Sequence, residues 1–202
     1  MMSDAHASAA APGGDDPAYS YRPSLIGAAW QLRLCPDALE WQTGRHQGRI
    51  HYGRIARVRM SFRPVTMQTR RFVTEIWPAG GAKLTIASTS WRSLVEQEAQ
   101  DSAYGAFIRA LHRRIAAAGA DASFETGVPP VLYWPGLVVF VALALGLAAL
   151  ALRALQIGQL SGAALVGGLL VLLLWQSGGY FRRNRPGRYR PDALPAELVP
   201  GG

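Results

Sequence analysis

The sequence predicts an α+β fold: a small antiparallel β-sheet or barrel, closed by one C-terminal amphipathic helix and followed by a two-helix transmembrane hairpin. Three observations lead to this prediction. Hydrophobic residues alternate with the period of strands early in the chain, recur later with the period of a helix, and then fill two long uncharged runs. Charge separates the regions, because residues 131–181 contain one charged residue, Arg153.

Short alternating segments predict five or six antiparallel strands before the apolar runs. The turn signal Pro36-Asp37 divides the first segment into a hairpin. A second hairpin is expected across the glycine-containing turn at residues 78–81. The strand segments are Trp30–Thr43, Ile50–Phe62, Arg71–Trp77 and Lys83–Ala87.

An amphipathic helix is expected after the strands. Its apolar stripe recurs at i, i+3, i+4, i+7 and i+11, which is the spacing of one helix face. Asp101 or Ser102 fits the start of this helix and Gly119 fits its end. The stripe consists of Tyr104, Phe107, Ile108, Leu111 and Ile115.

Two uncharged runs, Val131–Leu152 and Ile157–Trp175, predict the transmembrane hairpin. At 1.5 Å per residue the first run would cover roughly 33 Å, enough for a hydrocarbon core of about 30 Å. The alternative is a buried helix pair, but a chain of 202 residues has too little other material to cover both helices. We place the spans at residues 131–152 and 157–178, with a link too short to carry a domain.

Arginine placement predicts the orientation of the hairpin. Arginines flank both outer ends, whereas the link holds only Arg153. Both termini are therefore expected in the cytoplasm and the protein in the cell inner membrane. Aromatic residues mark the same interface, where amphipathic rings are favoured: Tyr133, Trp134, Trp175, Tyr180 and Phe181.

Composition sets the remaining boundaries. Residues 1–20 are expected to form a disordered tail, because they hold too little apolar surface to offset the entropy of ordering. The soluble domain is placed at residues 25–126. Residues 182–202 form a basic, proline-rich cytoplasmic tail, whose arginines are expected to fix topology; contact with headgroups or docking onto the domain are the alternatives.

The formal net charge of +8 suits nucleic acid or anionic lipid headgroups. Exposed aromatic residues do not interleave with the strand arginines, so no nucleic-acid partner is expected. The candidate residues that face a lipid or a protein partner are Arg57, Arg59, Arg63, Arg109, Arg113, Arg114, Arg182, Arg183 and Arg185.

Small residues in the second apolar run predict close helix packing. Gly158 and Gly162 form a GxxxG step, and Gly167 continues the set. Packing within the hairpin is favoured over a dimerisation face. Neither run contains an acid, lysine or histidine, which favours an anchor over a transporter.

The order of elements resembles the pleckstrin-homology-like superfold, as used in small bacterial membrane proteins. The resemblance rests on the strands Trp30–Thr43, the turn Gly48–Ile55, the arginine-alternating strand to Phe62 and the helix Tyr104–Ile115, and it covers about residues 25–125. It implies a binding module. Phosphoinositide-binding members use a Lys and Arg cluster near the first strands; Arg45 and Arg49 lie near a comparable loop, without the lysine.

The sequence contains no recognisable catalytic, cofactor or metal motif, so an enzyme is not expected. The leading hypothesis is a membrane-anchored binding or scaffolding module that presents its basic domain to a protein partner or to anionic lipid headgroups. A protein is favoured, because the hairpin already supplies membrane attachment. The alternative is an accessory subunit, or a homo-oligomer, assembled through the small-residue transmembrane face.

Overall fold

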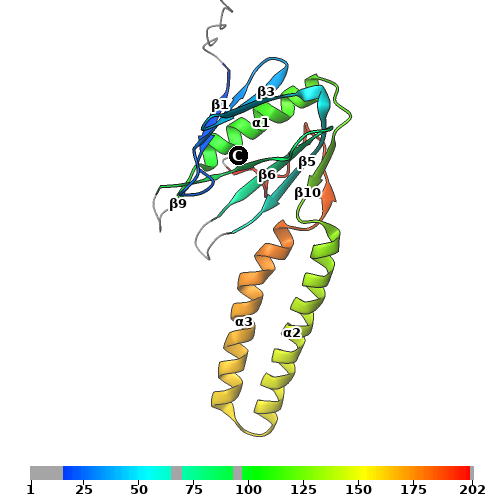
Figure 1. Cartoon of the computed structure of the whole chain (residues 1–202). Coiled ribbons are helices and arrows are strands. Elements are labelled where there is room, and N and C mark those ends of the chain that lie inside the picture. The colour runs from blue at the N-terminus through cyan, green and yellow to red at the C-terminus, as the bar shows by residue number, and fades with distance from the viewer. Residues whose placement is uncertain (1–15, 65–69, 93–96, 201–202) are drawn as a thin grey trace, which may run out of the picture.

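The computed structural model describes residues 16–64, 70–92 and 97–200. Figure 1 shows an α+β domain and a pair of long antiparallel helices that project from one side of it. Both helices join the domain at the same end of the pair. The domain and the C-terminal segment therefore lie on the same side of the hairpin.

The first sheet contains four antiparallel strands in the order β1-β2-β3-β4. Its inner face buries Leu32 and Leu34, while Gln31 and Arg33 are exposed, as expected from side chains that alternate between the two faces. The hairpin predicted around Pro36-Asp37 is confirmed. The strands are β1 Ala18–Tyr21, β2 Trp30–Leu34, β3 Ala38–Thr43 and β4 His46–His51.

Strand β1 extends the domain beyond its predicted start at residue 25. Tyr19 and Tyr21 point inward and are each 4% exposed. The Tyr19 hydroxyl donates to the Ala87 carbonyl at 2.7 Å, and the Tyr21 hydroxyl donates to the Thr85 carbonyl. Burial of two aromatic rings with satisfied hydroxyls offsets the entropy of ordering, so the prediction of a disordered tail to residue 20 is wrong for residues 18–20. Residues 1–15 lie outside the described residues.

The second sheet has the order β11-β10-β5-β6-β7. Its central strand β5 pairs antiparallel with β6 and parallel with β10. The antiparallel pairing of β6 with β7 confirms the second predicted hairpin. Strands β10 and β11 are additions that the sequence patterns did not predict. The bounds are β5 Ile55–Phe62, β6 Phe72–Pro78, β7 Leu84–Ala87, β10 Ser123–Thr126 and β11 Gly187–Arg188.

The barrel version of the predicted fold is wrong, because no strand pair joins the two sheets within the described residues. A 3-10 turn, η1 Tyr52–Arg54, carries the chain from β4 to β5. The other side of β5 is hydrogen-bonded to β10, so that side is not available to β4. A separate ribbon consists of β8 Thr89–Trp91 and β9 Gln97–Ala99.

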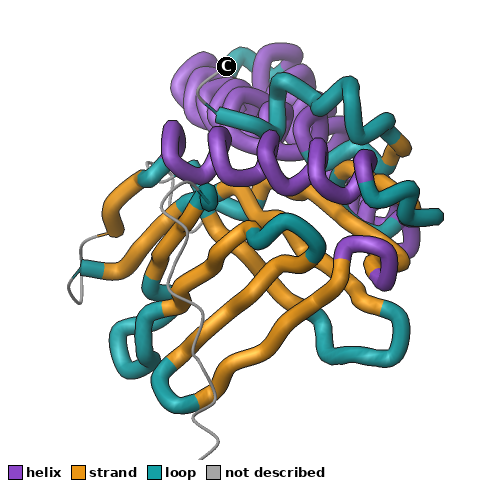
Figure 2. The backbone as a smooth tube through the Cα atoms, turned by 90° about the horizontal axis from the view of Figure 1, so that it is seen from above, coloured by secondary structure: helices purple, strands orange, loops and turns teal. Residues whose placement is uncertain are grey.

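Helix α1, Asp101–Ala117, confirms the predicted amphipathic helix. All five residues of the predicted stripe are buried in the core, and Gly119 follows the helix with φ +62°, a conformation that glycine adopts without strain. Figure 2 shows α1 running along one side of the strands. The helix therefore covers the core that the two sheets leave open.

Helices α2, Pro130–Gln156, and α3, Leu160–Arg183, form the hairpin. Both are long and apolar enough to cross a membrane, and only 0% and 6% of their most apolar windows are buried. Trp134 and Trp175 are 58% and 79% exposed. Apolar surface on this scale is not left in water by a soluble monomer, which distinguishes these helices from buried core helices.

The end of α3 is joined to β5 by one side chain. Asn184 is fully buried; its Oδ1 accepts from the Phe62 N–H at 3.0 Å, and its Nδ2 donates to the Phe62 carbonyl at 2.7 Å. The Asn184 carbonyl accepts from the Val128 N–H at 3.2 Å, next to the start of α2. This set of bonds, the Asn184 clamp, ties both hairpin helices to the last residue of β5.

The clamp requires glycine at position 127. Gly127 has φ +73°, and a Cβ there would lie 2.2 Å from the Asn184 carbonyl oxygen. The Gly127 N–H donates to the Met60 carbonyl at 2.7 Å. Only a residue without a side chain lets the two chain segments come this close.

The C-terminal segment docks onto the domain, which is one of the alternatives left open for the tail. Leu198 and Val199 are 2% and 6% exposed and belong to the core. Pro200 passes so close to α1 that a Cβ on Gly105 would lie 2.2 Å from its carbonyl oxygen. The tail is thus a structural part of the domain, in addition to any effect of its arginines on topology.

Replacing Asn184 with alanine tests the clamp. Asn184→Ala leaves the Phe62 N–H and carbonyl buried without partners, which should lower the free energy of unfolding by about 2–4 kcal/mol. Tryptophan fluorescence during urea unfolding of the full chain in detergent measures the loss. Arg185→Ala, an exposed neighbour, is the matched control, and equal loss in both variants would contradict the assignment.

Candidate functional site

The three predicted strand arginines lie on the outer face of β5, and two of them, Arg57 and Arg59, lie over the ring of Trp77. The Arg57 guanidinium is 4.2 Å from the centre of the Trp77 ring, and that of Arg59 is 5.4 Å away. The Lys83 ammonium lies 5.6 Å from the same ring. Cations over an indole face are attracted by its quadrupole, so these side chains are held against the sheet.

Two acids neutralise much of this face. Glu75 is 3% exposed and accepts from Arg63 at 2.9 Å and from Lys83 at 2.7 Å. Arg59 donates through Nε to Glu125 of β10 at 3.0 Å, and its own side chain is only 13% exposed. A buried carboxylate needs such partners to remain charged. The β5 arginines are thus engaged within the sheet, and only Arg63 keeps substantial exposure.

The α1 arginines do not form one surface. Arg114 pairs with Asp16 at 3.2 Å, on the N-terminal segment. Arg113 is exposed, whereas Arg109 is half-buried and lines a pocket at the base of the domain. The predicted set of three is therefore divided among separate environments.

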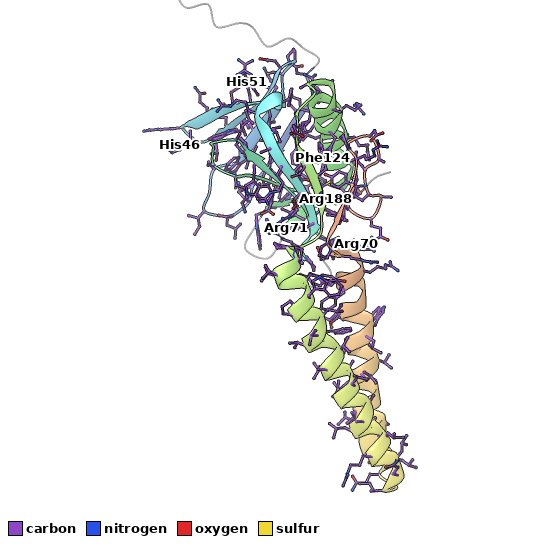
Figure 3. The ribbon with its side chains drawn as sticks, turned by 90° about the vertical axis from the view of Figure 1, so that its right-hand side faces the viewer. His46, His51, Arg70, Arg71, Phe124 and Arg188 are labelled. Carbon is purple, nitrogen blue, oxygen red and sulfur yellow. The ribbon has the colours of Figure 1, made fainter. Side chains whose placement is uncertain are left out.

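That pocket, the base pocket, has a volume of about 500 Å³ and lies where the domain meets α3. Three arginines line it, together with two acids and an apolar group of side chains. Figure 3 shows Arg70 and Arg71 beside the start of the hairpin, while His46 and His51 lie on the far side of the domain. The lining includes Arg70, Arg109, Arg183, Asp101, Glu197, Phe72, Leu194 and Val199.

The charged groups of the base pocket differ in their surroundings. The Arg183 guanidinium lies 4.9 Å from the centre of the Phe62 ring, which places it over β5. Burial raises the pKa of the Asp101 carboxyl, while a hydrogen bond from Ser88 and the charge of Arg70 act in the opposite direction. Arg182 and Arg185, which lie on either side of Arg183 in the sequence, are exposed and do not line the pocket.

A second hollow, the distal hollow, lies on the outer face of the four-stranded sheet and has a volume of about 660 Å³. Gln31, Gln42 and Gln47 face one another across β2, β3 and β4. Beside them runs a charged row that consists of Arg33, Glu40 and Arg49. The four-stranded sheet lies on the side of the domain away from the hairpin (Figure 1).

One charged contact stabilises the edge of the distal hollow. Arg49 donates to Asp37 at 2.6 Å, and this hydrogen bond holds the pKa of the Asp37 carboxyl below its usual range. The Nε of Arg49 also lies 3.8 Å from Oε1 of Glu40. The hollow therefore presents amides and mixed charges, without the excess of cations that the net charge of the chain suggests.

The predicted packing glycines have different positions. Gly158 lies in the link between the helices with φ +76°, so it cannot form a helical GxxxG step with Gly162. A Cβ added to Gly162 would meet only Gln159, and one added to Gly167 would meet no described atom within 4 Å. A side chain added at Gly162 or Gly167 would therefore not clash with α2.

His112 occupies the buried face of α1. Its Nδ1–H donates to the Ile108 carbonyl at 2.7 Å, which leaves Nε2 to accept from the Tyr189 hydroxyl at 2.8 Å. Phe124 of β10 packs against both rings. His112 and Tyr189 thus form a latch that holds the tail on the domain.

Sequence reasoning missed the residues that hold the tail and the hairpin in place. Tyr189, Leu198 and Val199 are apolar residues in a proline-rich segment, and this contrast was an available signal for docking. Asn184 carries no such signal, because its role depends on a carbonyl and an amide that lie 122 positions away in the chain.

A comparison with protein-family models, curated proteins and solved structures found no match to this chain. Within residues 16–64, 70–92 and 97–200, no group of three or more His, Cys, Asp or Glu side chains could hold a metal ion. The functional argument therefore depends on the geometry of the two hollows and the hairpin.

The latch predicts a pH-dependent stability. Burial lowers the pKa of His112 to about 4, against 6.5 in the unfolded chain. Between these two pKa values the unfolded chain binds more protons than the folded chain. The free energy of unfolding therefore decreases as the pH falls, by about 2 kcal/mol from pH 7 to pH 5. Urea unfolding at both pH values measures this loss.

His112→Gln should remove this part of the pH dependence, because glutamine does not titrate. His46→Gln, on an exposed histidine, is the control that should leave it intact. Identical pH dependence in wild type and His112→Gln would refute the role of the latch.

Proposed function

We propose that this chain is a two-span protein of the bacterial inner membrane that holds a pleckstrin-homology-like binding module at the cytoplasmic surface. The observation that carries the proposal is the pair of apolar helices, almost entirely unburied and tied to a folded domain by the Asn184 clamp. The order of a four-stranded antiparallel sheet, the three antiparallel strands β5–β7, the β8–β9 ribbon and then α1 supports the pleckstrin-homology-like assignment.

Arginine placement supports the cytoplasmic orientation. Arg182 and Arg183 end α3, and Arg185 follows it. Arg70 lies beside the base of the hairpin (Figure 3), whereas Arg153 is the only arginine near the other end. An excess of arginine at one end of a hairpin favours the cytoplasm for that end. In this orientation the domain and the tail share the cytoplasmic side.

The module binds a protein partner through the distal hollow. The strands that line the hollow lie on the side of the domain away from the hairpin (Figure 1), which separates them from lipid when the helices span the membrane. Its amide row and mixed charges offer directional hydrogen bonds, which suit a polypeptide segment better than a headgroup. The β5 arginines, which the sequence offered for lipid, are engaged with Glu75, Glu125 and Trp77.

A photo-crosslinking amino acid at Gln42, in the centre of the hollow, tests this surface in native membranes. We expect one discrete protein adduct, which should disappear when Glu40→Arg reverses the central charge of the hollow. The same amino acid at Arg113, exposed on α1, is the control and should give no such adduct. Equal adducts from both positions, or none from Gln42, would contradict the assignment.

A second candidate function, an accessory subunit of a membrane complex or a homo-oligomer, is favoured by one observation. A Cβ added to Gly167 or Gly168 of α3 would meet no described atom within 4 Å, so another helix could approach α3 closely there. The crosslinking experiment separates the two candidates. A partner captured from Ala164 on α3, with none from Gln42, supports the subunit.

The orientation is tested with reporter fusions. A cytoplasmic reporter fused after Gly202 should be active, and a periplasmic reporter inserted after Ala154 should also be active, because the hairpin places these points on opposite sides. A periplasmic C-terminus would refute the arrangement. Extraction of the membranes with alkaline carbonate measures insertion independently of either reporter.

A further inference from the structure

We propose that the base pocket binds the phosphate of an anionic phospholipid headgroup from the leaflet next to the domain. The inference depends on membrane insertion of α2 and α3, which is part of the proposed function. It adds a lipid site to a module whose proposed partner surface lies elsewhere.

Three arginines from separate segments meet at the base pocket: Arg70 before β6, Arg109 in α1 and Arg183 at the end of α3. Within the described residues Arg70 and Arg183 form no ion pair, in contrast to Arg59 and Arg63, which are held by acids. A guanidinium donates two parallel hydrogen bonds to phosphate oxygens. The cations of the base pocket are therefore suited to a phosphate, unlike those on β5.

The height of the pocket along α3 matches the headgroups. Arg183 lies three residues after Tyr180, about 4.5 Å along the helix, and eight after Trp175, about 12 Å. Tryptophan and tyrosine favour the membrane interface, and the headgroup layer extends roughly 5–7 Å beyond the hydrocarbon core. Arg183 would thus lie beside or just above the phosphates of the adjacent leaflet.

The apolar part of the lining also suits a lipid. Phe72, Leu194 and Val199 line the same pocket as the arginines. A free phosphate ion gains nothing from such surface, whereas the glycerol backbone and upper acyl chain of a phospholipid bury apolar area against it. This combination favours the lipid over a soluble anion that carries the same phosphate group.

Two acids line the pocket and must be compatible with an anion. With Asp101 and Glu197 both ionised, three arginines still exceed two carboxylates. The Asp101 Oδ1 is buried and has no hydrogen-bond partner among the described residues, and burial raises the pKa of this carboxyl. The pocket therefore keeps an excess of positive charge for an anion even when both carboxylates are ionised.

The test uses the full chain in phosphatidylcholine nanodiscs with and without a minor fraction of phosphatidylglycerol. Native mass spectrometry measures the phosphatidylglycerol that stays bound to the released protein. We expect retention to fall about five-fold for Arg70→Gln and again by about five-fold when Arg183→Gln is added. The control Arg185→Gln with Arg190→Gln removes the same charge from exposed positions outside the pocket and should retain the lipid.

Equal losses in the pocket and control variants would overturn the site, because they would reflect net charge alone. Retention unchanged in Arg70→Gln, whose exposed side chain can change without loss of folding, would overturn it as well. Displacement of the lipid by inorganic phosphate or glycerol phosphate would identify a soluble anion as the ligand and refute the lipid. Carbonate extraction and the reporter fusions show separately whether the proposed membrane insertion fails.

Discussion

The arrangement of the whole molecule depends on the pairing of the Asn184 side chain with the backbone of Phe62. The amide takes the place of a neighbouring strand at the end of β5, and it satisfies one donor and one acceptor that would otherwise be buried without partners. Because Asn184 immediately follows α3, the direction in which the hairpin leaves the domain is set by a sheet hydrogen-bond geometry. A flexible linker would leave that direction undetermined.

The clamp also explains why the sheet is extended after α1. Strand β10 runs parallel to β5 and ends at Thr126. Gly127 follows it and leads to the start of α2, beside Asn184 at the end of α3. Strand β11 then pairs with β10, so the chain passes through the hairpin and returns to the same sheet. The entry to α2 and the exit from α3 are held within one hydrogen-bonded unit.

Residue patterns within single segments were sufficient to predict the β2–β3 and β6–β7 hairpins, the apolar stripe of α1 and the two apolar helices. Strand β1 was not predicted, because two tyrosines in a segment that contains Ala and Pro do not form a strand pattern on their own. The site was less predictable than the fold. The alternation of β5 predicts Arg59 as an exposed cation, yet its partner Glu125 belongs to the parallel strand β10, which comes after α1 in the chain.

The clamp has a consequence for how the two hollows divide their tasks. In the proposed orientation the base pocket would meet the headgroup layer and the distal hollow would lie on the cytoplasmic side, so lipid and protein would be bound at separate places on one domain. The tail lines the base pocket through Leu194 and Val199 and contacts His112 of α1 through Tyr189. A ligand in the base pocket would contact the segment whose docking completes the core. Occupancy by lipid should therefore favour the docked tail, since a ligand that binds only the folded arrangement stabilises it.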